Sequence, residues 1–102
     1  MKKALRSKAP LPVKESDIRR QVRDYLRLKG WLVLYFLQGL GCYPGLSDMA
    51  AIKEGKVLWI EIKKPGKNVQ SEKQAEFQMQ LEAHGGVYII ARGIEDLEVL
   101  EI

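Results

Sequence analysis

The clearest strand in this sequence is the stretch VLWIEIK at residues 57–63. Because side chains alternate across a strand, its aliphatic residues share one face, and Trp59, Glu61 and Lys63 share the other. Glu61 and Lys63 then lie about 6.6 Å apart along the strand, since each residue rises about 3.3 Å. Both side chains therefore point into the same small volume. On this pattern alone, a solvated strand face with an exposed ion pair is the simpler interpretation.

Asp48 changes that balance because the chain brings it next to Glu61. It stands where a glycine-rich loop, residues 39–45, enters a short apolar strand. A three-residue turn at 54–56 makes that strand the antiparallel neighbour of the strand with Glu61. Counting outward from the turn, Asp48 falls opposite Ile62, to within one residue. We therefore expect Asp48 and Glu61 on adjacent strands within reach of one ion; the alternative is an ordinary turn aspartate.

The rest of the chain supplies helices and strands in the order α-β-β-β-α-β. Ser71 and Gln74 form a capping-box signature for the second helix, and glycines follow both helices. This order predicts an α/β fold with one mixed β-sheet flanked by helices. The expected elements are a helix at 15–29, strands at 31–38, 48–53 and 57–64, a helix at 71–84, a strand at 87–91 and a candidate edge strand at 97–102.

Two polar side chains are expected on the inward faces of the helices. Glu15 lies three residues before Ile18, and Gln74 lies three residues before Phe77, so each falls on an apolar stripe. An inward carboxylate or amide needs a partner. Alone, Glu15 is explained as a first-turn acid and Gln74 as part of the capping box. Neither explanation accounts for five polar groups converging on one side of one sheet.

A metal ion would account for the convergence. Acids held close together repel each other, and burial strengthens the repulsion, which a divalent cation relieves. Oxygen ligands without a set of cysteines and histidines indicate magnesium or manganese. We expect Asp48 and Glu61 to bind the ion directly, together with the carbonyl of Ile62. Lys63 would orient the attacking water or stabilise a pentacovalent phosphorus.

Several lysines around the expected site are candidate nucleic-acid contacts. Lysines commonly hold phosphates, although surface lysines more often only keep a protein soluble. The candidates are Lys53, Lys64, Lys67 and Lys73.

The net charge of +4 is concentrated at the N-terminus. Residues 1–14 hold five of the 17 basic residues and no acid, so residues 15–102 carry a charge of −1. Pro10 and Pro12 disfavour a helix there. We therefore expect a flexible basic arm at residues 1–14, which contacts phosphates or only solubilises, ahead of a single domain at residues 15–102.

Length and composition exclude several classes of protein. A chain of 102 residues can bury one core. Its longest apolar run, residues 31–37, falls far short of the roughly 20 residues that cross a bilayer. The single cysteine, Cys42, allows no internal disulfide, and no zinc-binding pattern of Cys and His is present. We expect a cytoplasmic protein that does not bind membranes.

The acidic residues and the lysine also fit a known sequence pattern. Asp48 followed by residues 61–63 is an instance of the D…(D/E)-x-K pattern of the PD-(D/E)XK nuclease superfamily. The flanking sequence resembles the VRR-NUC domain more specifically: Glu15 before a helix, GLSD at 45–48, WIEIKKPG at 59–66 and SxxQ at 71–74. The resemblance spans residues 14–91. Ser47 departs from the proline that superfamily members often have at that position, so we expect a local difference in the turn.

The resemblance implies a restriction-endonuclease-like αβββαβ core that hydrolyses phosphodiester bonds with Mg²⁺ or Mn²⁺. In that family Asp48 and Glu61 would be metal ligands and Lys63 the catalytic lysine, with Glu15 and Gln74 completing the site. Some VRR-NUC domains occur within larger DNA-repair nucleases. Stand-alone domains resemble enzymes from phage and bacterial cells that act as homodimers on four-way DNA junctions, where two-fold symmetry supplies the second cut.

The expected function is therefore a structure-specific DNA endonuclease, a dimeric Holliday-junction resolvase. A nicking or flap nuclease keeps the same chemistry on another substrate. A non-catalytic nucleic-acid-binding module would leave inward-facing Glu15 and Gln74 without a purpose. A site that binds an ion only for structural stability is the other alternative, and a cation such as Lys63 beside the ion would weaken its binding.

Overall fold

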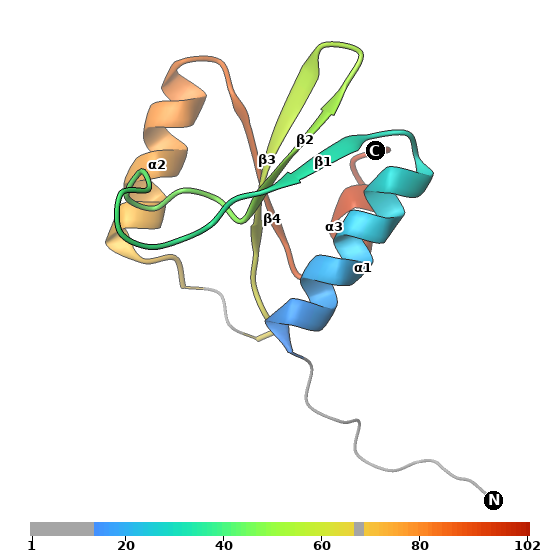
Figure 1. The fold of residues 1–102 in the computed structure, drawn as a ribbon, viewed down its shortest axis with the longest axis horizontal. Helices are drawn as coiled ribbons and strands as arrows, with labels where there is room; N and C mark the ends of the chain where they lie inside the picture. The colour runs from blue at the N-terminus through green and yellow to red at the C-terminus, as the bar shows by residue number, and fades with distance from the viewer. Residues whose placement is uncertain (1–13, 67–68) are drawn as a thin grey trace, which may run out of the picture.

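The computed structural model describes residues 14–66 and 69–102, so the predicted basic arm lies outside the described residues except for Lys14. Figure 1 shows a sheet with α2 on one face and α1 and α3 on the other. The helices are α1 (Glu15–Leu28), α2 (Glu72–Ala83) and α3 (Glu95–Glu98), and the strands are β1 (Leu32–Tyr35), β2 (Met49–Lys53), β3 (Lys56–Ile62) and β4 (Val87–Ala91). No helix in the described ranges has the length and apolar character needed to cross a membrane.

The four strands form one sheet in the order β1-β2-β3-β4. Pairing is antiparallel between β1 and β2 and between β2 and β3, whereas β3 and β4 run parallel and are joined through α2. A parallel pair requires such a crossover. The predicted α/β class, with a mixed sheet between helices, is therefore confirmed.

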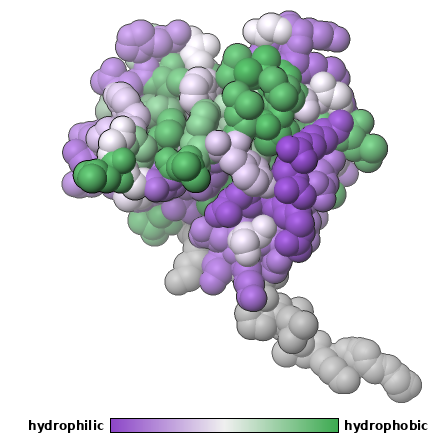
Figure 2. Space-filling model, in the orientation of Figure 1, coloured by the Kyte–Doolittle hydropathy of each residue, from purple (hydrophilic) through white to green (hydrophobic). Residues whose placement is uncertain are grey.

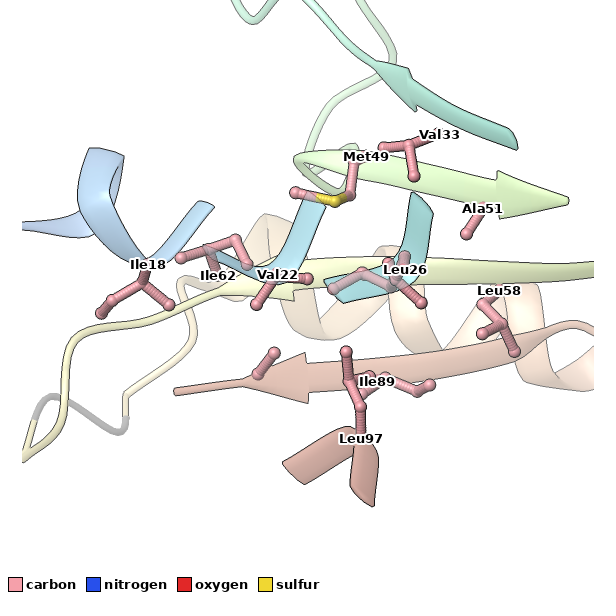
Figure 3. Close-up of a cluster of buried hydrophobic side chains, with 12 residues drawn as sticks. Ile18, Val22, Leu26, Val33, Met49, Ala51, Leu58, Ile62, Ile89 and Leu97 are labelled. Atoms are coloured by element: carbon pink, nitrogen blue, oxygen red, sulfur yellow. The ribbon is translucent and has the colours of Figure 1, made fainter. Parts of the chain in front are cut away.

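Helix α1 forms because apolar residues recur along one side of a charged segment. Ile18, Val22 and Leu26 are at most 2% exposed. Gly30, at a φ of 95°, takes the left-handed conformation just after the helix. Figure 3 shows the three side chains of α1 packed among aliphatic side chains from all four strands and Leu97. This apolar cluster is the core of the protein.

The β2–β3 hairpin has a shorter turn than the sequence analysis assumed. Lys53 pairs with Lys56, so only Glu54 and Gly55 form the turn. Both have positive φ, 51° and 80°, as a type I′ turn requires. The register therefore shifts by one residue, within the stated tolerance. Met49 pairs with Ile60, and one further residue in this register puts Asp48 opposite Glu61 instead of Ile62.

Helix α2 covers the opposite face of the sheet with much less apolar burial. Its predicted capping box is confirmed, since Ser71 Oγ accepts from the Gln74 N–H at 3.1 Å and Gln74 Oε1 accepts from the Ser71 N–H at 3.0 Å. Within the helix, Phe77 alone is buried. The Phe77 ring meets the rings of Trp59 and Tyr88, each at a centroid distance of 6.1 Å. An aromatic cluster therefore fastens α2 to the sheet.

The candidate edge strand at 97–102 is wrong. The chain turns into α3 after β4, because Asp96 Oδ2 accepts from the Arg92 N–H at 2.7 Å. Leu97 then points into the core and is fully buried. The Tyr25 hydroxyl donates to the carbonyl of Ile102 at 2.8 Å. The C-terminal segment is thus held against α1, and β4 is left as an edge of the sheet.

Candidate active site beside the ends of strands β2 and β3

Asp48 is fixed at the start of β2 by backbone hydrogen bonds on both sides. Its N–H donates to the carbonyl of Ile60 at 3.0 Å, and its carbonyl accepts from the Phe36 N–H at 3.0 Å. Its carboxylate Oδ2 accepts from the N–H of Ile62 at 2.7 Å. The half-buried carboxylate is therefore held toward the end of β3.

The loop before Asp48 is held by side-chain hydrogen bonds to its backbone. Gln38 Nε2 donates to the carbonyls of Leu46 and Ser47 at 3.1 and 3.0 Å, and β1 ends at Tyr35, earlier than the strand expected at 31–38. Ser47, standing where superfamily members often have proline, is fully buried, and its hydroxyl donates to the Met49 carbonyl at 3.2 Å. Gly45 has a φ of 79°, and a Cβ there would clash with the backbone carbonyl at the start of α2. The loop is thus packed against that helix.

Glu61 is the unusual residue of the site. It is 4% exposed, and its Oε2 accepts from Gln74 Nε2 at 2.7 Å. Its Oε1 is buried without a hydrogen-bond partner among the described residues. Burial first, and then the charge of Asp48, raise the pKa of Glu61 from 4.5 to about 8, although Lys63 opposes the shift. The site therefore holds an acid whose ionisation needs a cation.

Lys63 and Gln74 form one hydrogen-bonded unit with Glu61. The Lys63 Nζ lies 3.9 Å from Glu61 Oε2 and donates to Gln74 Oε1 at 3.0 Å. The same Oε1 accepts the Ser71 N–H of the capping box. Gln74 therefore serves both roles that the sequence left as alternatives. It caps α2 and fixes the charged groups of Glu61 and Lys63.

Glu15 is not buried against the sheet, which corrects the sequence prediction. As the first residue of α1, it is exposed. It lines a cavity of about 590 Å³ together with Lys63 and Lys64, and its charge raises the pKa of Glu61, less strongly than Asp48 does. Among residues 14–66 and 69–102, no three His, Cys, Asp or Glu side chains are close enough to share a metal ion. Glu15 thus lies at the rim of the site.

The four candidate lysines do not lie together around the site. Lys64 lines the cavity with Glu15. Lys73 lies on α2 in an exposed ion pair with Glu76 at 3.8 Å. Lys53 lies at the far end of β2, where its Nζ donates to the Lys29 carbonyl at 2.8 Å, so it does not lie around the site as predicted. Lys67 lies outside the described residues.

One basic residue near the site was missed by the sequence analysis. Arg19 of α1 lines a second cavity, of about 260 Å³, together with Asp48 and Gln38. The signal was present, because Arg19 follows Glu15 by four residues and so lies on the same side of the helix. It went unused because a surface arginine is common and its partner strand is not evident from spacing.

The chemistry of the donor set fits a magnesium ion. Mg²⁺ is usually held by one or two carboxylates and keeps several waters, and Asp48 and Glu61 supply that number. The unpartnered Oε1 of Glu61 is the kind of buried polar atom that a cation satisfies. The carbonyl of Ile62 stays a predicted ligand. The N–H of the same residue already binds Asp48.

Comparison with known proteins gives the site no name. No protein-family model matches the chain, and no curated protein matches it. The site therefore has to be interpreted from its geometry, which combines two carboxylates, an ammonium group and an amide beside two cavities.

Proposed function

We propose that this protein is a metal-dependent DNA endonuclease of the PD-(D/E)XK type, with a domain of the VRR-NUC kind. The observation that carries the proposal is Glu61, an acid buried beside Asp48 with one oxygen unpartnered among the described residues. Burying such a group destabilises a fold, so its presence indicates a function. Lys63, whose Nζ lies 3.9 Å from Glu61 Oε2, adds a cation that would stabilise developing charge on a phosphate beside the metal.

Each side chain has a distinct task in this proposal. Asp48 and Glu61 would hold Mg²⁺ or Mn²⁺, with the carbonyl of Ile62. A bound ion of this kind lowers the pKa of a water molecule and stabilises charge on the leaving oxygen. Lys63 Nζ would donate to a non-bridging phosphate oxygen or to the attacking water. Gln74 keeps Glu61 and Lys63 in position through its two hydrogen bonds.

The arrangement of the elements also supports the proposal. The observed order α1-β1-β2-β3-α2-β4 matches the αβββαβ order expected of a restriction-endonuclease-like core. Asp48 precedes β2, while Glu61 and Lys63 belong to β3 and the residue after its end. Gln74 comes from the next helix. The sheet and α2 thus bring together Asp48, Glu61, Lys63 and Gln74, which the resemblance assigns to one active site, whereas Glu15 stays at the rim.

We infer further that the substrate is branched DNA and that the protein acts as a homodimer. The strand β1 lies at an edge of the sheet, where its backbone can pair with another strand. Its side chains Leu32 and Leu34 are 58% and 41% exposed. Figure 2 shows apolar surface over the region of β1 and the β2–β3 hairpin. Two copies joined through β1 would place two sites on one four-way junction.

Cleavage assays test this function directly. A labelled four-way junction, a linear duplex and a flap are incubated with the full chain and Mg²⁺, and in parallel with a chelator. We expect paired symmetric cuts in the junction that disappear with the chelator. Cuts confined to the flap, or to one strand of the duplex, would replace the resolvase with a flap or nicking nuclease. No cleavage of any of the three substrates with Mg²⁺ or Mn²⁺ would refute the proposed nuclease activity.

Variants locate the chemistry. We expect Asp48→Ala and Glu61→Gln each to lower the rate by at least about 10²-fold, the scale on which loss of one charge-stabilising group acts. Glu76→Gln is the matched control, since Glu76 is exposed on α2 and interacts with Lys73 instead of the site. Circular dichroism checks that each variant folds. Unchanged cleavage by folded Glu61→Gln would exclude the proposed site.

A further inference from the structure

The cavity next to Asp48 is lined by a positively charged side chain, that of Arg19, which has no role in the proposed chemistry. Its volume is about 260 Å³, and it is lined by Arg19, Tyr35, Phe36, Leu37, Gln38 and Asp48. Arg19 belongs to α1, whereas the other residues belong to β1 and the segment between β1 and β2. Packing of the helix against the strands therefore creates this cavity.

Arg19 is available to bind a ligand, unlike two neighbouring arginines of α1. Arg20 binds Asp17 at 3.0 Å, and Arg23 binds Asp24 at 2.9 Å. Within the described ranges, no carboxylate lies within ion-pair distance of Arg19, and its side chain is half-buried. The Tyr35 hydroxyl donates to the Arg19 carbonyl at 3.5 Å, which connects this turn of α1 to β1.

Both cavities are lined by residues from the start of α1 and by residues of the candidate site. Glu15 lines the larger cavity with Lys63 and Lys64, and Arg19 lines the smaller one with Asp48. Glu15 and Arg19 are about one helical turn apart, or roughly 6 Å along the axis. Figure 1 shows the first turns of α1 next to the end of β3. One cavity thus holds Lys63 and Lys64, and the other holds Arg19 next to Asp48.

We propose that Arg19 binds the phosphate next to the one that is cut, so that a single DNA strand crosses the site from Lys64 to Arg19. The guanidinium group suits this role because it can donate two parallel hydrogen bonds to one phosphate. The scissile phosphate would then lie over Asp48 and Glu61. The inference rests on the proposed nuclease function and adds a strand path and a phosphate-binding residue to it.

Binding measurements provide the first test. The full chain is titrated with labelled four-way junction DNA in Ca²⁺, a condition chosen to prevent cleavage, at several salt concentrations. We expect Arg19→Ala to weaken binding about tenfold and to reduce the slope of log K against log [salt] by about 1, because one phosphate contact is lost. Arg23→Ala, a change on the same helix at a paired arginine, should alter neither quantity. Equal behaviour of the two variants would overturn the inference.

Substrates with one neutral linkage provide a sharper test. Methylphosphonates replace the phosphates around the cut one at a time, and cleavage with Mg²⁺ is measured for the wild type and for Arg19→Ala. At one position adjacent to the cut, neutralisation should slow the wild type about tenfold and the variant hardly at all, since the variant has already lost that contact. Arg19→Lys should fall between them, because it keeps the charge without the paired geometry.

The outcomes separate this inference from the function beneath it. If the wild type cuts DNA and each neutral linkage slows both proteins by the same factor, Arg19 does not bind a backbone phosphate. If the wild type neither binds nor cuts DNA, the nuclease function itself is refuted. A thermal melt of Arg19→Ala and Arg19→Lys shows whether the folded protein was tested.

Discussion

The two faces of the sheet differ sharply in what they bury. Toward α1 and α3, strand and helix side chains form a continuous apolar core, with Val22, Leu26 and Leu97 fully buried. Toward α2, the helix buries only Phe77, and the sheet buries the carboxylate of Glu61. The first face stabilises the fold. The second holds the candidate site.

This difference indicates how a chain of 102 residues can support a costly site. A buried acid with a raised pKa lowers stability near neutral pH, and a small domain has only a few kcal/mol in reserve. Concentrating apolar burial on one face leaves the other free to hold Asp48, Glu61 and Lys63. Truncating a buried apolar side chain on the α1 face should therefore lower the stability of the protein, whereas removing the buried charge on the α2 face should raise it.

The largest effect on stability is expected from the α1 face. Leu26→Ala removes a fully buried side chain and should lower the free energy of unfolding by about 2–5 kcal/mol. Leu28→Ala, on the same helix but 86% exposed, should change it by no more than about 0.5 kcal/mol. Urea denaturation measures both. Similar losses for the two variants would contradict the assignment of this face as the core.

On the α2 face, removing a charge should stabilise the metal-free protein. Because the pKa of Glu61 is about 8 in the folded protein and 4.5 ordinarily, the folded state binds more protons between those values. The free energy of unfolding therefore falls as pH rises from 4.5 to 8. Glu61→Gln removes this loss and should raise Tm by about 5 °C or more at pH 8, with little gain at pH 4.

Magnesium provides a second comparison between the wild type and Glu61→Gln. It should raise Tm of the wild type at pH 8, because an ion that binds only the folded state stabilises it, and it should leave Glu61→Gln nearly unchanged. Scanning calorimetry with and without chelator measures both effects. Glu76→Gln, at an exposed position, is the control and should behave as the wild type. A drop in Tm for Glu61→Gln at pH 8 would show that the buried carboxylate of Glu61 does not destabilise the folded protein.

A smaller effect separates the two roles of Gln74. Ser71→Ala removes the cap of α2 without touching Glu61 or Lys63, so it should cost about 1 kcal/mol and preserve cleavage. Gln74→Ala keeps the backbone bond to Ser71 Oγ but removes the reciprocal half of the capping box and both site contacts, so cleavage should fall about tenfold. Denaturation curves and cleavage rates, measured together, test the distinction. Parallel loss of cleavage in both variants would make Gln74 a cap alone.

The smallest change in stability is expected at the open edge. Leu34→Lys places a charge at a 41%-exposed position of β1 and should leave Tm nearly unchanged. It should nevertheless dissociate the proposed dimer, since lysine on an edge strand opposes pairing. Light scattering at micromolar concentration measures the mass. A monomeric wild type, or a variant that remains dimeric, would exclude β1 as the dimer interface.

Local sequence rules predicted most of the elements, and their failures have local causes. The hairpin register was off by one residue because Glu54 takes a positive φ, which let two residues make a turn counted as three. The last segment looked like a strand because it is short and apolar. A hydrogen bond from the Arg92 N–H to Asp96 and the burial of Leu97 turned it into a helix instead.

By itself the sequence determined which groups share a strand face and which residues begin α2. Alternation along β3 puts Glu61 and Lys63 on one side, and the capping box follows from Ser71 and Gln74, because both depend on neighbours within a few residues. Only the tertiary structure decided that Glu61 is buried, that Glu15 stays at the rim and that Arg19 comes to lie beside Asp48. Those placements depend on how α1 and α2 pack across the sheet, and side-chain spacing along the chain carries no record of that packing.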